Sequence, residues 1–499
     1  MSRRSGSFAF GEPGLRLAAP ALCSIFLAAL AGCVHMDSLS ARISPAPEAA
    51  YAPPAGAAAP SVAEPPAAIP PALEATRQHW TLNELVDLGL ANNMQTRIAW
   101  GAARSAAAAA GAARGSYFPK LSLDANGAKT KGSAVGGRFV YDYSSLTPTA
   151  GVTWLLFDFG GRGGLNEEAR QALAAANWTQ NTAIQNVILQ VEQAYYNYLG
   201  ARSLMEAAQV ALKDAAKNLE AAEARHAAGV ATLADTLQAK TALSNIQLGL
   251  ITARGTVLTL KGVLASAVGL PANASFEIED GLPSTLPLDQ ASGGVESFIA
   301  QAQARRPDLA AARSLALKAE AHVQTVRSDG LPTLNFSGTL GRVYYSTPAQ
   351  SSSLNAAVLL DIPLFRGFAN SYQILQATSD AENAKAQVKK AEQDVILQVW
   401  TSYYNVQTAA QTVKTAEDLF ATARQSYDVT LAGYKDGVGS ILDLLAAETA
   451  LENGRMQLVQ AKALWLTSVV QFAHDTGAID LPAKTVSEPA PAAGGKGER

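Results

Sequence analysis

Hydrophobic positions in this chain recur with two different periods, and the longer period marks helices. From Val187 to Leu219, apolar and small residues return at alternating steps of four and three, and the series is repeated from Val395 to Phe420. A period near 3.5 residues over several heptads is typical of helices packed in a coiled-coil manner, and alanines in the series allow close approach. The pattern predicts two long helices, over about 160–228 and 367–435.

A second apolar series follows each long helix. Its members, all seven positions apart, are Leu243, Leu250, Val257 and Leu264, then Leu451, Leu458, Trp465 and Phe472. These series predict returning helices over about 232–268 and 440–476 that pack along the long ones. If the first long helix is continuous, it is about 95 Å long at 1.5 Å per residue, which exceeds an ordinary globular domain.

The shorter period, an alternation of apolar and polar residues, marks strands. Leu334, Phe336 and Leu340 alternate with polar neighbours, and 121–126 alternates in the same way. This pattern is typical of a strand with two different faces. We predict β-hairpins over about 119–158 and 332–365, with the Gly- and Ser-rich runs 132–137 and 351–353 as their exposed loops.

Aromatic residues gather at the ends of the predicted strands. They are Tyr117, Phe118, Trp154, Phe157, Phe159, Tyr344, Tyr345, Phe365 and Phe368. Outer-membrane barrels carry aromatic girdles at this place. Four strands cannot close a transmembrane barrel, because the smallest single-chain barrels have about 8, so the chain would contribute strands to an oligomeric barrel. Two copies would supply about 8 strands and three copies about 12, and the pattern leaves both open.

The two halves of the chain are related by duplication. The stretch Val187–Asn197 recurs 208 positions later as Val395–Asn405, and the same offset pairs Gly229 with Gly437. A repeat of this length sets the architecture. We predict a first structural repeat over 79–285 and a second over 286–482.

The N-terminal region predicts export and a lipid anchor. Residues 1–32 combine early arginines with an apolar stretch over 17–30 that is too short to span a membrane, which is typical of a signal peptide. The Leu30-Ala-Gly-Cys33 sequence resembles the lipobox of bacterial lipoproteins, which implies a lipidated Cys33. The other interpretation is an ordinary signal peptide with an incidental cysteine. The Ala- and Pro-rich region 33–78 and the tail 483–499 are predicted to be disordered.

Composition argues against several function classes. A net charge of −3 and 16% charged residues give no basic surface for nucleic acid. The five histidines show no pair at metal-ligand spacing, and no hydrolase or nucleotide-binding signature occurs. The Gly-rich run Gly160–Gly164 lacks the Lys-Ser/Thr of a phosphate loop, so we interpret it as a flexible junction between hairpin and helix. We expect no enzyme activity and no cofactor besides the lipid.

In its whole plan the chain resembles the TolC-like outer membrane factors of the lipoprotein type. The resemblance rests on the duplication and on four segments in order: Leu82–Asn93, Arg306–Leu309, Pro363–Gly367 and Gly437–Leu445. It implies a mainly α protein with membrane β-structure, a homotrimer whose hairpins form one shared barrel above a periplasmic α-helical tunnel. It also implies passive export through the outer membrane with a periplasmic adaptor protein and an inner-membrane transporter of the RND or ABC type, in efflux or type I secretion.

The two helix-turn-helix segments are the candidate gate. Gly229 and Gly437 open the turns, and Thr232-x-x-Asp235 and Ser440-x-x-Asp443 have the pattern of capping boxes. This local role already explains an acid near each helix start. The resemblance implies more: Asp443 at an acidic constriction, and Asp235 and Tyr434 in links that hold the tip closed.

The chain departs from that family pattern at two positions. Gly439 stands where a linking Arg is expected, and Ala446 stands where a second acidic ring is expected. We therefore predict fewer polar links and a closure that is partly apolar, through Val438, Ile441 and Leu442.

Two alternatives remain from the sequence. A lipid-anchored periplasmic coiled-coil scaffold without a pore requires the strand segments to be soluble or disordered. An envelope enzyme is disfavoured, because no convergent set of acid, base, nucleophile or metal ligands can be assembled.

Overall fold

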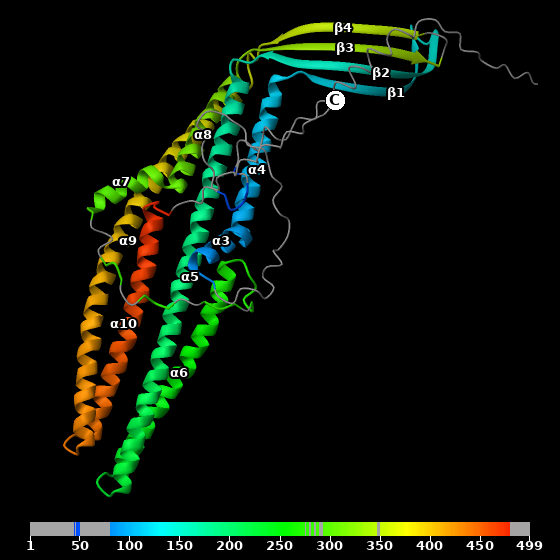
Figure 1. The fold of residues 1–499 in the computed structure, drawn as a ribbon. Helices are drawn as coiled ribbons and strands as arrows, with labels where there is room; N and C mark the ends of the chain where they lie inside the picture. Colours follow the sequence, from blue (N-terminus) through cyan, green and yellow to red (C-terminus); the bar gives the residue numbers. More distant parts are fainter. Residues whose placement is uncertain are drawn as a thin grey trace, which may run out of the picture.

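The protein is elongated, with a β-sheet at one end and two helical hairpins that extend to the other (Figure 1). The computed structural model describes residues 44, 46–49, 80–274, 276–278, 281–283, 286–288, 293–346 and 350–479. The predicted signal peptide, Cys33 and the tail 483–499 lie outside the described residues, as does most of the predicted linker.

The same order of elements occurs in both halves of the chain. The first half contains α3 (Leu82–Asn92), α4 (Met94–Arg114), the short η2 (Gly115–Tyr117), β1 (Lys120–Ala134), β2 (Phe139–Phe157), α5 (Gly161–Ala227) and α6 (Leu233–Ala267). The second half contains α7 (Val295–Arg305), α8 (Pro307–Ser328), β3 (Thr333–Tyr345), β4 (Gln350–Asp361), α9 (Ala369–Lys435) and α10 (Ile441–Asp475). The predicted long and returning helices are present, with ends within two residues of those expected.

The long helices α5 and α9 are continuous. Each has 67 residues, which corresponds to about 100 Å. In α9 the predicted series is buried from Val395 to Ala416. In α5 it is buried from Val187 to Ala201 and again at Ala215, but between them Ala207 and Ala211 are buried, each one position before a member of the series.

The sheet is antiparallel throughout, with strand order β1-β2-β3-β4. Leu123 pairs with Ala150, Trp154 with Phe336, and Leu340 with Leu354. Every residue of β4 is exposed. Among the described residues, the edge strands β1 and β4 each pair on one side only.

The first predicted hairpin loop began too early in the chain, and the second lies inside a strand. Gly132–Ala134 belong to β1 and Ser351–Ser353 to β4, so the first turn contains only residues 135–138. Gly132 lies under the ring of Tyr141, where an added Cβ would be 2.7 Å from the ring carbon Cζ. Glycine here permits a close cross-strand contact and does not mark a loop.

The Gly-rich junction between β2 and α5 is packed and does not behave as the flexible connection that the sequence suggested. Asp158 Oδ2 accepts a hydrogen bond from the Arg162 backbone N–H at 2.6 Å, and the Arg162 side chain donates to the carbonyl of Leu156. Gly164 is buried against α8, where a Cβ would be 2.8 Å from the backbone nitrogen of Thr325. These glycines let two helices approach closely.

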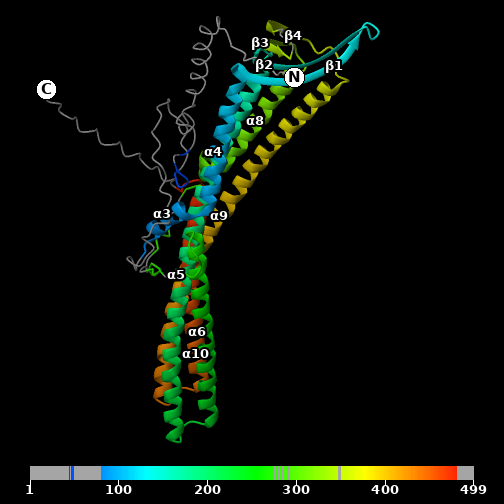
Figure 2. The ribbon, with the colours of Figure 1, turned by 90° about the vertical axis from the view of Figure 1, so that its right-hand side faces the viewer.

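The interior consists of separate clusters strung along the helices. One joins α3, α5 and α6 around Leu85, Ile184 and Leu264, another surrounds Trp465 on α10, and a third lies near the tip around Leu444. The helices converge towards the tip into one narrow column (Figure 2). Such a shape leaves a large surface that a single chain does not cover.

One stretch of the predicted disordered linker is seated on the helices. Trp100 Nε1 donates to the carbonyl of Ser44 at 2.9 Å, and Gln180 Nε2 donates to the carbonyl of Ala49 at 3.1 Å. The reason is a polar buried face on α5, whose amide side chains require hydrogen-bond partners.

Candidate functional site at the helical tip

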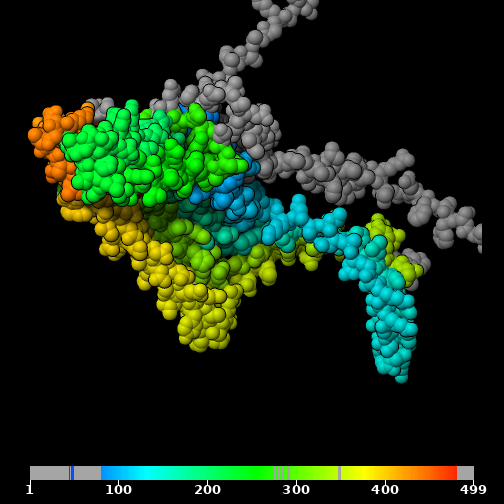
Figure 3. Space-filling model, turned by 90° about the horizontal axis from the view of Figure 1, so that it is seen from below, coloured from blue at the N-terminus to red at the C-terminus, as the bar shows by residue number. Residues whose placement is uncertain are grey.

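The two turns at the tip have the same backbone structure. Gly229 and Gly437 adopt positive φ angles of 74° and 81°. After each, the next residue's N–H bonds back to a helix carbonyl, Val230 to Arg225 at 3.0 Å and Val438 to Gly433 at 3.0 Å. Glycine ends a helix in this way because it enters the left-handed region without a Cβ clash. Seen from below, the tips of the two hairpins lie side by side (Figure 3).

The predicted caps form, one completely and one by half. Thr232 Oγ1 accepts from the Asp235 backbone N–H at 3.2 Å, and Asp235 Oδ2 accepts from the Thr232 backbone N–H at 2.8 Å. Ser440 Oγ accepts from the Asp443 N–H at 3.2 Å and donates to Asp443 Oδ2 at 2.7 Å. Both carboxylates thus lie at helix N-termini, where the helix dipole stabilises negative charge.

Tyr434 joins the two hairpins through its backbone and ring. It is 3% exposed, and Arg225 at the end of α5 donates from Nη1 to its carbonyl at 2.6 Å. The guanidinium carbon also lies 4.8 Å from the centre of the Tyr434 ring. Sequence reasoning singled out Tyr434 but missed Arg225, whose only signal was a cation in the last turn of a long helix.

The Tyr434 hydroxyl makes no hydrogen bond to any described residue. Burial raises the pKa of this hydroxyl, Arg225 opposes the rise, and Asp235 adds to it. Asp235 is therefore near enough to act on Tyr434 electrostatically, although within one chain its carboxylate bonds to its own cap.

Gly439 has a steric reason within this chain. A Cβ at this position would be 3.0 Å from the backbone nitrogen of Tyr434 and 3.1 Å from the carbonyl carbon of Gly433. An Arg link at 439 would require the turn to move. Ala446 is exposed and adds no charge.

Of the three apolar residues predicted to close the tip, one is buried inside the chain. Ile441 is 5% exposed and packs with Leu444 and Tyr427 inside the chain, so it is not available to close an opening. Val438 and Leu442 are 86% and 61% exposed. These two remain available at the end of the tip.

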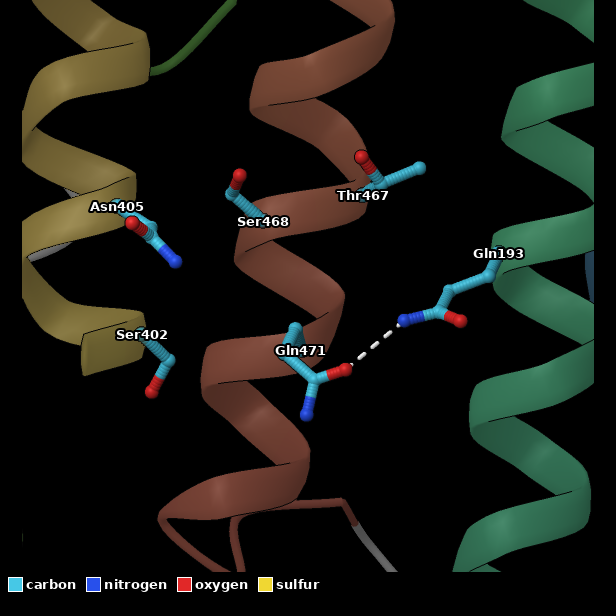
Figure 4. A pocket seen from close by; sticks show the side chains of 6 residues that line it. All are labelled: Gln193, Ser402, Asn405, Thr467, Ser468 and Gln471. Carbon is cyan, nitrogen blue, oxygen red and sulfur yellow. Dashed lines mark hydrogen bonds between the residues drawn. The ribbon is translucent and has the colours of Figure 1, made fainter. Parts of the chain in front are cut away.

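A polar cavity of about 190 Å³ lies higher between the two hairpins (Figure 4). Its lining residues are Gln193, Ser402, Asn405, Thr467, Ser468 and Gln471. Gln193 Nε2 on α5 donates to Gln471 Oε1 on α10 at 2.9 Å. All six side chains are neutral, so the cavity contains no acid–base pair. Elsewhere in the described part of the chain, no three His, Cys, Asp or Glu residues are grouped to hold a metal ion.

The sequence matches a family profile over most of the helices and strands described above. Residues 85–270 and 298–478 match the sequence profile of the family described as "Outer membrane efflux protein". The chain belongs to this outer membrane efflux protein family. The two matched segments cover the two halves that share one order of elements.

Two named proteins are similar to this chain over most of its length. It is 26% identical to protein CyaE of Bordetella pertussis over 384 residues, which are 76% of this chain and 80% of CyaE. It is 24% identical to the outer membrane protein TolC of Salmonella enteritidis over 383 residues, 74% of this chain and 76% of TolC. The predicted TolC-like resemblance is confirmed.

Solved structures agree on the fold. The outer-membrane channel OprN superposes with a TM-score of 0.71 at 19% identity, over 79% of this chain and 89% of OprN. The outer membrane protein VceC of Vibrio cholerae also gives 0.71, at 21% identity, over 79% of this chain and 96% of VceC. The predicted combination of helical hairpins with a β-hairpin sheet is therefore confirmed.

Proposed function

We propose that this outer membrane efflux protein is the exit duct of a tripartite export assembly and conducts its substrates passively across the outer membrane. The observation that carries the proposal is the joining of an incomplete, outward-apolar sheet to helices about 100 Å long. The sheet is suited to a membrane, and helices of this length are suited to span a periplasmic distance.

Closure of the sheet requires other copies of the chain. In the part of the chain that the structure describes, β1 and β4 each leave a row of backbone donors and acceptors unpaired, and such edges are not tolerated in lipid. Leu121, Leu123, Leu354 and Val358 are each more than 60% exposed, as expected for a face that contacts lipid. Three copies give about 12 strands, and the proposed assembly is a homotrimer.

The helices also need partners from other copies. α6 is long and apolar enough to span a membrane by length and composition alone, yet it packs along α5 and most of its surface is exposed. Leu248, Ile251 and Leu258 are among its most exposed side chains. Cover by a neighbouring copy explains this surface, because large exposed apolar patches mark interfaces.

A passive exit duct needs partner proteins that drive the substrate into it. A periplasmic adaptor and an inner-membrane transporter, of the RND or ABC type, would deliver the substrate. Relatives include the alkaline protease secretion protein AprF and the efflux protein BepC, so both secretion and efflux occur among similar proteins. Lipid on Cys33 would add a second attachment to the outer membrane. The protein itself would catalyse no reaction.

At the tip, three copies of Asp235 and Asp443 would surround a common axis. Rings of carboxylates attract cations and are blocked by them. The test is single-channel conductance of the purified full-length protein in a planar bilayer, compared with the Asp235→Ser/Asp443→Ser double variant. Small cation-selective currents that increase in the variant support a duct with an acidic constriction. Failure of the folded protein to insert would favour the scaffold without a pore.

A further inference from the structure

A buried carboxylate that faces a buried amide lies between the two hairpins, just above the tip. Glu448 of α10 is 3% exposed and faces Asn218 of α5, which is 1% exposed. The Asn218 carbonyl oxygen accepts a hydrogen bond from the Tyr427 hydroxyl at 3.3 Å. Neither oxygen of Glu448 nor the amide nitrogen of Asn218 meets hydrogen-bond geometry with any group in the described ranges.

Two further carboxylates adjoin Glu448. Glu452 lies one helical turn along α10, and its buried Oε1 also has no hydrogen-bond partner among the described groups. Asp214 lies one turn from Asn218 on α5 and is close enough to act on both glutamates. The three acids thus come from both hairpins and lie at one contact between α5 and α10. We call this contact, with Asp214, Asn218, Glu448 and Glu452, the seam.

Few cations offset these charges. Lys217 lies 3.6 Å from Asp214 but is 63% exposed, and Arg455 of α10 is drawn over the ring of Phe420 at 5.9 Å. Tyr427 of α9 packs at this contact, while Asp428 and Arg424 of the same helix are exposed to solvent. The residue of α6 that packs there is the apolar Ala239.

The surroundings favour the protonated form of the two glutamates in this seam. Burial raises the pKa of Glu448, Asn218 opposes the rise, and Asp214 adds to it. Burial also raises the pKa of Glu452 to about 7, Glu448 and Asp214 add to this, and Arg455 opposes it. A buried acid of this kind stabilises the packed state when neutral, and that stability is lost as the pH rises through its pKa in the packed state.

We propose that Glu448 and Glu452, which lie beside Asp214, form a proton-binding latch that holds the two helical hairpins together at acid pH and releases them as the pH rises. Protonated carboxyl groups can donate a hydrogen bond across the seam, whereas ionised ones repel each other there. Glu448 is eight residues beyond Ser440, about 12 Å along α10, so the latch acts close to the tip. The effect on a channel rests on the proposed function.

The first test measures opening of single channels between about pH 5.5 and pH 8.5, a range that includes the raised pKa of Glu452, about 7. For the wild type we expect the open-to-closed ratio to increase with pH, by up to about tenfold per unit for each proton released. The Glu448→Gln/Glu452→Gln variant should lose this dependence and stay near the acid level. Asp418→Asn, an exposed carboxylate of α9, is the matched control and should behave as the wild type.

A second readout separates the latch from the channel. Amide hydrogen exchange over residues 441–455, corrected for intrinsic rates, should show protection that falls with pH in the wild type and not in the double variant. The same comparison with Glu452→Gln alone covers a failure of the double variant to fold. Unchanged pH dependence of exchange in the glutamine variants would overturn the latch. Absence of current with the exchange result intact would overturn the channel and leave the latch standing.

Discussion

Arg225 supplies the strongest link at the tip that the structure shows between the two hairpins, and replacing it with alanine should loosen them. The substitution removes the hydrogen bond from Nη1 to the Tyr434 carbonyl and the contact with the ring. A hydrogen bond from a charged group contributes about 1.5–3 kcal/mol, and a partly exposed cation–π contact about 0.5–1 kcal/mol. The sum of about 2–4 kcal/mol corresponds to a roughly 30- to 1,000-fold shift in the docking equilibrium of each chain.

Hydrogen exchange at the ends of α5 and α9 measures this shift directly. We expect faster exchange near residues 222–227 and 431–437 in Arg225→Ala, and partial recovery in Arg225→Lys, which keeps the charge but not the planar fork. Arg254→Ala removes an exposed arginine from α6 and is the control. If Arg225→Ala and Arg254→Ala exchange alike, the Arg225 link does not hold the two hairpins together at the tip.

Two further predictions concern local packing. Gly164→Ala should lower the unfolding free energy by about 1–3 kcal/mol, because the added Cβ would clash with α8. Gly163→Ala is the control and should change it little, since the nearest atom to a Cβ there beyond its own helix backbone, the Tyr117 hydroxyl oxygen, is 3.9 Å away. Equal melting temperatures of the two variants would contradict this. Thr232→Ala should cost about 1 kcal/mol through loss of the cap, read as faster exchange in the first turn of α6. Thr241→Ala, whose hydroxyl bonds only within its own helix, is the control, and the cap has no such role if both variants exchange alike.

Periodicity was sufficient for the large elements. The 3.5-residue series around Val191 and Val399 predicted α5 and α9, because each series is long and its buried face is continuous. The duplication then placed the second half by analogy with the first. Helix ends followed from glycines such as Gly229, whose positive φ is a requirement of the backbone.

Contacts between segments far apart in the chain could not be predicted from the sequence. Arg225 meets Tyr434 from 209 positions away, and nothing local distinguishes it from an exposed arginine. Gly439 stands where the family pattern has an Arg, and the sequence did not show that backbone atoms of Gly433 and Tyr434 leave little room for a Cβ there. Ser351–Ser353 looked like a loop because serine is common in turns, but strand pairing overrides that preference.

The proposed function requires copies of this chain to complete one another's sheet and helical wall. Native mass spectrometry of the full-length protein, extracted in mild detergent, shows whether they do. We expect an assembly of three copies that keeps its β-structure and separates only when heated. A stable single copy with the sheet intact, and no larger species, would contradict it, because the edges of β1 and β4 would then persist without partners.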